Sequence, residues 1–451
     1  MEENKKLNKK YGLPTAISMV IGTVIGSGVF FKASKVLSAN NGNMVKSLAT
    51  VLIVGLIMLV CAYVFSLLAA RVDKVNGLVD YAEISCGPFY AYSVGWYASA
   101  IFYPTITSCL AWISANYIII LFGINLGWWF HYLLAAFLLT ASFFFNIISP
   151  KLSGKFQVST TAIKLVPLSI MAVVGTLIGL INGTTLSNLT SEHLTVSGGS
   201  GLFGAIVAFA FAYEGWIFAT TINSEIKNSK KNLPRALFFG AIVIIAVYVL
   251  YFVGLMSVLS VEEIVAAGDD LPRAAFSALF GSPLFGTVIY VFVVISCLGT
   301  MNGLMLVCTR GMYSISVRGD GFAPRLFSRI NEKTDMPTAS AIFALVASFI
   351  WLTQWQLGFI NGFFPDFLSF ENDELPIITF YIACIPIFIY VMRKCKDLGT
   401  VKRFVIPSLA CLACVFMVFC AIYSYREDAL YYLIVFSVIM AIGLPFYKKK
   451  A

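Results

Sequence analysis

The sequence has 451 residues, of which 59% are hydrophobic and only 12% charged, and its mean hydropathy is +0.87. This composition excludes an ordinary soluble globular domain and is typical of an integral membrane protein. The formal net charge of +9 reflects 31 Lys and Arg against 22 Asp and Glu. Because membrane proteins collect basic residues in their cytoplasmic loops, this excess does not indicate a nucleic-acid partner.

Uncharged runs long enough to cross roughly 30 Å of hydrocarbon recur along the whole chain. They are continuous, whereas the strands of a membrane β-barrel alternate over about ten residues, so the sequence predicts an all-α membrane protein. One transmembrane domain is expected over residues 1–451. Its twelve predicted spans are 13–32, 46–70, 86–122, 127–148, 154–181, 201–222, 233–259, 284–309, 337–355, 375–392, 403–424 and 428–447.

The basic residues predict the orientation of these spans. With the N-terminus placed in the cytoplasm, 25 Lys and Arg fall in the two termini and the loops on that side, and five fall on the opposite side. The positive-inside rule therefore predicts cytoplasmic N- and C-termini. We expect a multi-pass protein of the cell membrane.

The first span contains the glycine-rich stretch VIGTVIGSGVFFK, residues 20–32. Gly22 and Gly26 form a small-xxx-small pattern that lets two helices approach closely, which is one interpretation. The other is a broken helix, because Gly26, Ser27 and Gly28 are three adjacent poor helix formers. An unwound segment at membrane depth frees backbone amides and carbonyls, which a small zwitterion can satisfy.

A second interruption is predicted in the sixth span, where AFAFAYEGWIF covers residues 208–218. Its sequence Gly215-Trp-Ile-Phe echoes Gly28-Val-Phe-Phe of the first span. The two spans enter the membrane from opposite sides, so we expect an inverted repeat with halves at about 11–182 and 200–394, followed by additional helices at about 403–447. A binding site is expected between the two broken helices.

Two ionisable residues lie deep in apolar stretches, where such groups are costly and usually functional. Lys164 is predicted either to lock helices through an internal ion pair or to act as a fixed cation that holds the broken first span. Glu214 is predicted to be a buried structural acceptor, a proton carrier or a counter-ion for an ammonium group.

The remaining polar residues give weaker signals. His131 and His193 are isolated, and the sequence shows no nucleotide-binding glycine loop or nucleophile elbow, so no metal, no cofactor and no enzyme activity are predicted. Two outer loops are acidic, and we expect their carboxylates to be solvated, with an outer cation funnel as the alternative; they are Glu262, Glu263, Asp269, Asp270, Asp366, Glu371, Asp373 and Glu374.

Four motifs in order resemble the amino acid–polyamine–organocation superfamily, and more narrowly its L-amino acid transporter branch, which includes bacterial serine/threonine-type exchangers. They are GTVIGSGVFFK, FAFAYEGW, SEIKNSKKNLPRAL and TRGMYSISVRGDGFAPRLFSRINEKTDMPTAS, and the similarity covers essentially the whole chain. The resemblance implies a LeuT-type fold with a five-plus-five inverted repeat, broken helices 1 and 6, and two C-terminal helices. One departure is Val317-Arg318-Gly319-Asp320-Gly321, where the family commonly has Ala-Arg-Asp-Gly.

The resemblance also implies the binding residues. The glycine-rich segment around Gly26 is expected to take a substrate carboxylate on the amides of Ser27 and Gly28. The substrate amino group is expected on carbonyls of Val24 and of the 208–212 stretch, which contains Ala208, Phe209, Phe211 and Ala212. Lys164 matches the lysine that replaces a coupling sodium ion in this branch. Thr107 and Leu304 are weaker candidates for side-chain selection.

The expected function is therefore sodium-independent exchange of small neutral L-amino acids by alternating access. Proton-coupled uptake and exchange of cationic amino acids or polyamines are the variants, and both depend on Glu214. A membrane receptor that binds amino acids without moving them, or a membrane enzyme, is disfavoured. The expected partners are amino acid substrates and membrane lipid, with no nucleic acid. The lack of Cys in the predicted outer loops argues against a covalently attached heavy chain.

Overall fold

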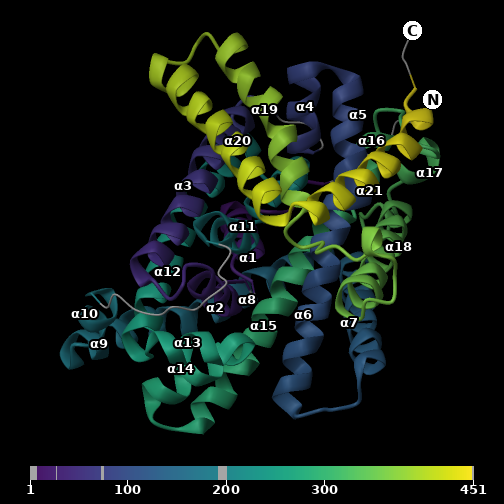
Figure 1. The fold of residues 1–451 in the computed structure, drawn as a ribbon. Coiled ribbons are helices and arrows are strands. Elements are labelled where there is room, and N and C mark those ends of the chain that lie inside the picture. Colours follow the sequence, from purple (N-terminus) through teal and green to yellow (C-terminus); the bar gives the residue numbers. More distant parts are fainter. Residues whose placement is uncertain (1–7, 27, 73–75, 191–200, 449–451) are drawn as a thin grey trace.

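The computed structural model describes residues 8–26, 28–72, 76–190 and 201–448, and these residues form a helical bundle without β-sheet (Figure 1). Within these described ranges, eleven helical segments are long and apolar enough to cross a membrane. They are Met44–Ala69, Pro88–Phe122, Trp128–Ile148, Pro150–Asn182, Gly201–Glu225, Ser229–Val258, Pro283–Ser316, Thr338–Ile360, Pro376–Lys394, Val401–Tyr425 and Glu427–Phe446. The predicted first span is present as two shorter helices, α1 (Leu13–Val24) and α2 (Gly28–Ala39).

The individual elements divide these spans as follows. The main helices are α3 (Met44–Ala69), α5 (Pro88–Tyr97), α6 (Tyr103–Phe122), α7 (Trp128–Ile148), α8 (Pro150–Ile170), α9 (Thr176–Asn182), α11 (Gly201–Tyr213), α12 (Ser229–Val258), α15 (Pro283–Cys308), α16 (Gly311–Ser316), α18 (Thr338–Thr353), α19 (Pro376–Lys394), α20 (Ile406–Tyr425) and α21 (Glu427–Gly443). Short connecting helices are α4 (Gly77–Cys86), α10 (Thr184–Thr190), α13 (Val261–Ala267), α14 (Leu271–Phe280) and α17 (Pro324–Phe327).

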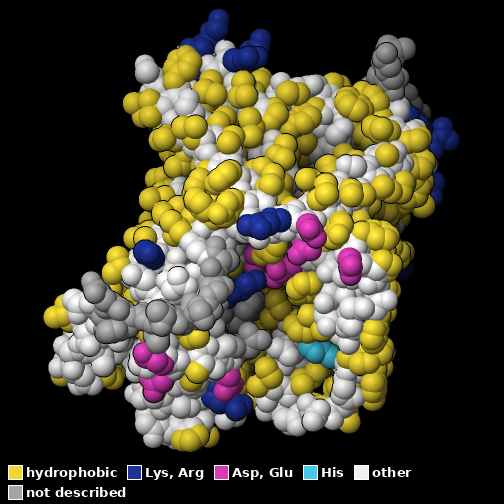
Figure 2. Space-filling view, viewed as in Figure 1, with side chains coloured by type: hydrophobic (Ala, Val, Ile, Leu, Met, Phe, Trp, Pro, Cys, Tyr) yellow, Lys and Arg dark blue, Asp and Glu magenta, His cyan; other side chains and the backbone are white. Residues whose placement is uncertain are grey.

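Both ends of the described chain lie at the same end of the bundle, which we name the terminal end; the opposite end, with α13 and α14, is the distal end (Figure 1). Hydrophobic side chains cover much of the upper part of the surface, and Lys and Arg side chains stand at its upper edge (Figure 2). An apolar belt of this kind fits a protein immersed in hydrocarbon.

The first and sixth spans are interrupted at the predicted places. Ile25, which follows α1, has an extended conformation with φ −72° and ψ 91°, and α2 begins at Gly28. In the sixth span, α11 ends at Tyr213, and Gly215 takes φ +107°, a left-handed conformation that favours glycine. The chain continues as the 3₁₀ segment η3 (Trp216–Glu225).

The interrupted helices pair with opposite chain direction. α1 packs beside η3, and α2 packs beside α11, so the two breaks lie at a similar level of the bundle. Equivalent spans of the two predicted halves also lie side by side, as α3 with α12, α6 with α15 and α7 with α18. This pairing is the arrangement expected of an inverted repeat. The residue limits of its halves stay a prediction.

Two predicted span ends are wrong because they were placed at charged residues that the fold buries. The eighth span was predicted to end at residue 309, but it continues through α16 since Arg310 is 1% exposed and paired with Glu225. The first span was predicted to end at 32, but α2 continues to Ala39 since Lys32 is buried and paired. A charge that has found its counter-ion does not end a membrane helix.

Candidate functional site

The two breaks enclose a small internal cavity at the centre of the bundle. Its volume is about 20 Å³, which is room for about one water molecule. It is lined by Thr23, Val24, Gly26, Gly28, Ile106, Leu110, Phe211, Glu214, Phe218, Thr300 and Leu304. A cavity of this size does not hold an amino acid, so the space between the two breaks is closed in this structure.

Backbone groups freed by the breaks face this region. Since α2 begins at Gly28, its first amides have no intrahelical carbonyl, and a helix N-terminus attracts anions. The carbonyl oxygens of Val24 and Ala212 both lie near the Tyr248 hydroxyl, at 3.0 and 2.8 Å. Because that hydroxyl has a single proton, it donates to one of the two carbonyls at a time. The other carbonyl then remains available to an incoming donor.

Lys164 is fully buried beside the first break. Its Nζ donates to the carbonyl oxygens of Gly22 and Ile25, at 2.9 and 2.6 Å, and to Thr300 Oγ1 at 2.9 Å. An ammonium group has three protons, so these three acceptors satisfy it. The carbonyls belong to the C-terminal end of α1, which carries partial negative charge. No carboxylate pairs with Lys164 in the described part of the chain, so the ion-pair interpretation is not supported.

Glu214 lies between α11 and η3 and lines the cavity from the opposite side. Its side chain is 4% exposed, and Oε2 has no hydrogen-bond partner among the described residues. Only this oxygen is unsatisfied, because the carboxyl group also has a backbone hydrogen bond from Gly215. A buried unsatisfied oxygen is costly, so the proton-carrier and counter-ion interpretations stay open beside the structural one.

Only some of the other predicted binding residues line the cavity. Phe211 and Leu304 line the cavity, whereas Ala208 and Phe209 do not; the Phe209 ring packs against Tyr213 at 5.5 Å. The Thr107 hydroxyl does not line the cavity either, because it donates to the Tyr103 carbonyl at 2.7 Å and lies 3.1 Å from Cys308 Sγ. Ser27 lies outside the described residues.

The glycines of the first span also serve packing. A Cβ atom at Gly22 would lie 2.3 Å from Thr161 Oγ1, and one at Gly28 would lie 2.8 Å from the Ala212 Cα. Both interpretations of this stretch therefore apply, because the same glycines interrupt the helix and let it approach its neighbours. A side chain at Gly28 would separate α2 from α11 as well as obstruct the site.

Ion pairs close the bundle between the site and the terminal end. Glu225 at the end of η3 accepts from Arg310 Nη2 at 2.8 Å and from Lys10 Nζ at 3.0 Å. Lys10 Nζ also lies 3.0 Å from Asp335 Oδ2. We name these four residues the terminal seal. The hydropathy pattern placed Glu225 and Arg310 in loops and gave no sign of their pairing.

The unusual loop after the eighth span lies at the same end. Arg318 pairs with Asp80, and its Nε lies 3.3 Å from Glu83 Oε2. The extra Gly319 adopts φ +87°, and Asp320 Oδ1 accepts from the Lys448 amide at 3.1 Å. The inserted glycine thus forms a left-handed turn, and the loop connects the α4 region with the C-terminal segment.

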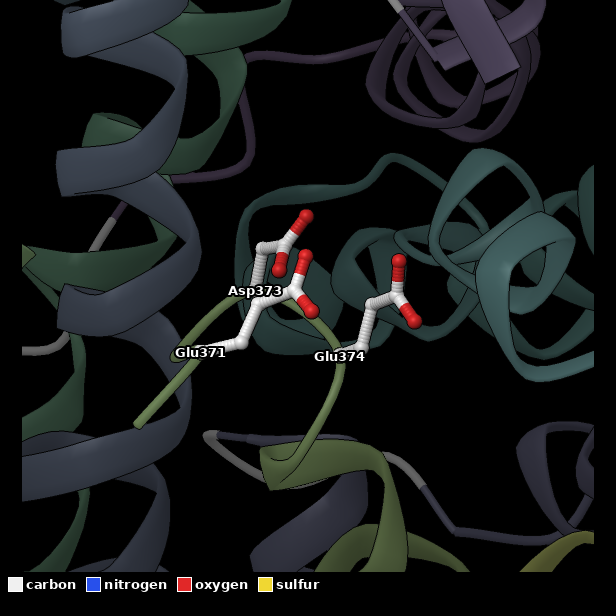
Figure 3. A group of neighbouring side chains, drawn as sticks. All are labelled: Glu371, Asp373 and Glu374. Carbon is white, nitrogen blue, oxygen red and sulfur yellow. The ribbon is translucent and has the colours of Figure 1, made fainter. Parts of the chain in front are cut away.

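The distal end is closed by a second cluster. The prediction of solvated loop carboxylates is wrong for Asp373 and Glu374, whereas Glu262, Glu263, Asp270 and Asp366 are exposed as predicted. Lys32 pairs with Glu374 and, at 3.2 Å, with Asp373, while Lys35 pairs with Glu371 at 3.1 Å and Glu374 at 3.0 Å. Asp373 and Glu374 are buried. We name these five residues the distal cluster. The three carboxylates project from one loop in the same direction (Figure 3).

The charges of the distal cluster are strongly coupled. Burial would raise the pKa of Glu374, but the Lys32 and Lys35 ammonium groups outweigh it and lower that pKa to about 2. Burial and the neighbouring carboxylates raise the pKa of Glu371 to about 7. The carboxylate oxygens of this loop lie within 4.8 Å of one another, a spacing that could hold a metal ion. In this structure the ammonium groups of Lys32 and Lys35 are the cations that pair with these carboxylates.

A vestibule of about 220 Å³ opens at this cluster, lined among others by Lys32, Glu371, Asp373, Trp112 and Trp355. A hollow with acidic and basic side chains is visible in the lower half of the molecule (Figure 2). Lys32 Nζ lies 5.1 Å from the centre of the Phe211 ring, which lines the inner cavity. A residue of the vestibule wall is therefore in contact with a residue of the inner cavity wall.

Two interrupted helices, a closed cavity between them and a seal toward each end are the features of a secondary transporter held in a closed conformation. Residues 11–444 match the amino acid permease family, and the chain belongs to this family. Membership confirms the predicted transporter of amino acids and the prediction that the protein is not an enzyme.

Several relatives are similar over most of their length. The serine/threonine exchanger SteT of Bacillus subtilis (strain 168) is 31% identical over 412 residues, which cover 90% of this chain and 88% of the relative. The human cystine/glutamate transporter is 27% identical over 430 residues, covering 94% and 82%. The human large neutral amino acids transporter small subunit 2 is 26% identical over 382 residues, covering 79% and 68%.

Proposed function

We propose that this permease exchanges small neutral L-amino acids across the cell membrane by alternating access and needs no sodium ion. The observation that carries the proposal is the contact of Lys164 with the end of α1. Two backbone carbonyls and one hydroxyl around a buried cation are a ligand set that would suit a sodium ion. A covalently attached ammonium group fills that place permanently.

The freed backbone groups supply recognition of any α-amino acid. The carboxylate binds at the α2 amides, where the helix N-terminus is partially positive. The ammonium group binds the carbonyl of Val24 or Ala212 that Tyr248 does not occupy. Phe211 and Leu304 then limit the side chain, and their apolar surfaces favour a small neutral substrate. The Bacillus relative is named a serine/threonine exchanger, and serine and threonine are small neutral amino acids of the kind proposed here.

Exchange follows if the two seals open in alternation. Opening toward the distal end requires the distal cluster to separate, and opening toward the terminal end requires the terminal seal to separate. We place the terminal end in the cytoplasm, because most of the Lys and Arg outside the spans belong to that side. We further propose that no covalent heavy chain is needed, since Cys86, the one exposed cysteine, is the last residue of α4 on the terminal side.

Counterflow in proteoliposomes tests the function. Vesicles that are empty or preloaded with unlabelled serine take up radiolabelled alanine or serine in sodium-free buffer. We expect uptake only into preloaded vesicles. Equal uptake into empty and preloaded vesicles would contradict obligatory exchange and would indicate a uniporter or an ion-coupled carrier.

Glu214 favours a second candidate function. Glu214 lines the cavity, and its buried Oε2, which has no hydrogen-bond partner among the described residues, would accept a proton or a cationic side chain. If this carboxyl drives transport, arginine competes with labelled alanine, or uptake falls when a pH gradient is collapsed. Competition by arginine would move the substrate class to cationic amino acids, and dependence on the gradient would make the protein a proton-coupled carrier.

A further inference from the structure

A basic pocket lies at the terminal end, away from the transport site. It has a volume of about 500 Å³ and is formed by the chain before α1, the start of α1 and the start of α8. Its lining residues are Lys10, Tyr11, Thr15, Lys151, Gly154, Lys155, Val158 and Ser159. No acidic residue of the described chain is among them, so we name it the basic pocket.

The inner wall of the basic pocket is fixed by several contacts. Tyr11 packs on Gly154, where an added Cβ atom would lie 2.9 Å from the ring. The Tyr11 hydroxyl donates to the Pro150 carbonyl at 3.4 Å. The backbone amides of Lys10 and Tyr11 donate to the Glu225 carbonyl at 2.8 and 3.0 Å. The pocket is therefore a formed feature between two membrane helices.

The charges of the pocket fall into two groups. The Lys10 ammonium is engaged by Glu225 and Asp335, as part of the terminal seal. Lys151 and Lys155 lie one helical turn apart on α8, and both are exposed. Neither has an ion-pair or hydrogen-bond partner in the described ranges of the chain. Two adjacent ammonium groups beside a hollow attract a doubly anionic or monoanionic oxyanion such as a phosphate.

We propose that the basic pocket binds the phosphate headgroup of an anionic phospholipid. The neighbouring surface supports a lipid over a soluble phosphate, because Ile148 and Leu152 are 69% and 51% exposed at the end of α7 and the start of α8. Apolar side chains at this exposure suit contact with acyl chains. Basic pockets between membrane helices are known places for acidic headgroups. The proposal does not depend on which substrate the protein carries.

Native mass spectrometry of the purified full chain tests the proposal. The protein is held in detergent micelles that contain dioleoyl phosphatidylglycerol or dioleoyl phosphatidylcholine, and the retained lipid is counted. We expect a clear preference for phosphatidylglycerol. The double variant Lys151→Gln/Lys155→Gln should weaken phosphatidylglycerol binding roughly 30-fold, at about fivefold per lysine. The charge-preserving variant Lys151→Arg/Lys155→Arg should retain it.

The control variant is Lys230→Gln/Lys231→Gln, which removes two exposed lysines from the start of α12 at the same end of the bundle. It should retain the preference, and size-exclusion profiles should show that all variants fold. Unchanged phosphatidylglycerol binding by the Lys151/Lys155 glutamine variant would overturn the proposal. Displacement of the lipid by millimolar inorganic phosphate would also overturn it, because the site would then serve a soluble phosphate.

Discussion

Lys164 and Glu214 are both buried at the breaks of the interrupted helices, but their surroundings differ. Lys164 reaches three acceptors, which match its three protons, and so fixes the end of α1. Glu214 lines the cavity, and its buried Oε2 has no hydrogen-bond partner among the described residues. A satisfied charge holds a structure in place, whereas an unsatisfied one can respond to what enters the cavity. The first is therefore suited to replace a resident cation and the second to sense substrate or protons.

The largest effect is expected from Lys164→Met, which keeps the length of the side chain and removes its charge. The carbonyls of Gly22 and Ile25 would lose hydrogen bonds to a charged donor, each worth about 1.5–3 kcal/mol. We expect sodium-free counterflow to fall at least tenfold while the amount of purified protein stays within about twofold. Wild-type counterflow by this variant would remove the proposed role of Lys164.

The variant Glu214→Gln tests whether the unsatisfied carboxyl group takes part in transport. Glutamine keeps the shape but cannot change its charge, so exchange of neutral substrates should persist within about threefold. Any competition by arginine should disappear, because arginine would lose its counter-ion. Rates measured with labelled alanine, with and without arginine, check both expectations. A complete loss of alanine exchange would instead assign Glu214 an essential proton.

Tyr248→Phe tests whether the two breaks share one hydroxyl. Without it, the carbonyls of Val24 and Ala212 lose a donor worth about 0.5–1.5 kcal/mol in the empty protein. Both carbonyls are then open to the substrate ammonium group, which gains a second hydrogen bond of that size, so the apparent KM for alanine should fall about three- to tenfold. A higher KM would show that the hydroxyl assists substrate binding.

The smallest expected effect concerns the distal cluster. Because burial and neighbouring carboxylates raise the pKa of Glu371 to about 7, its ionised form destabilises the closed cluster, and this cost is fully present above pH 7. It disappears as the pH falls and Glu371 takes up a proton. Exchange should therefore be about threefold faster at pH 8 than at pH 6. Glu371→Gln should show the pH 6 rate at both values, and an unaltered pH profile in this variant would contradict the explanation.

Much of the fold could be predicted from the sequence, because hydropathy directly reports burial in hydrocarbon. The spans agree with the helices to within a few residues, and the largest differences lie where a charge is buried with a distant partner, as at Lys32 and Arg310. Pairing between residues hundreds of positions apart leaves no local pattern. The same reason explains why Asp373 and Glu374 were expected in solvent.

In the candidate site, too, some residues could be predicted from the sequence and others could not. Gly28, Gly215, Lys164 and Glu214 were predictable because glycines and charges are unusual inside a membrane helix. Tyr248, which joins the two breaks, was not, because a tyrosine in an apolar helix carries no sign of its partner. Thr107 was expected near the substrate, yet its hydroxyl is engaged by its own helix and by Cys308.

The most direct test of the central claim is equilibrium binding of alanine to the purified protein, measured by calorimetry in sodium chloride and in choline chloride. The account predicts that the wild-type Kd is the same in both salts within about twofold, because Lys164 already occupies the place of the cation. A Kd that tightens tenfold or more in sodium would contradict it, since a sodium ion would then be part of the binding site.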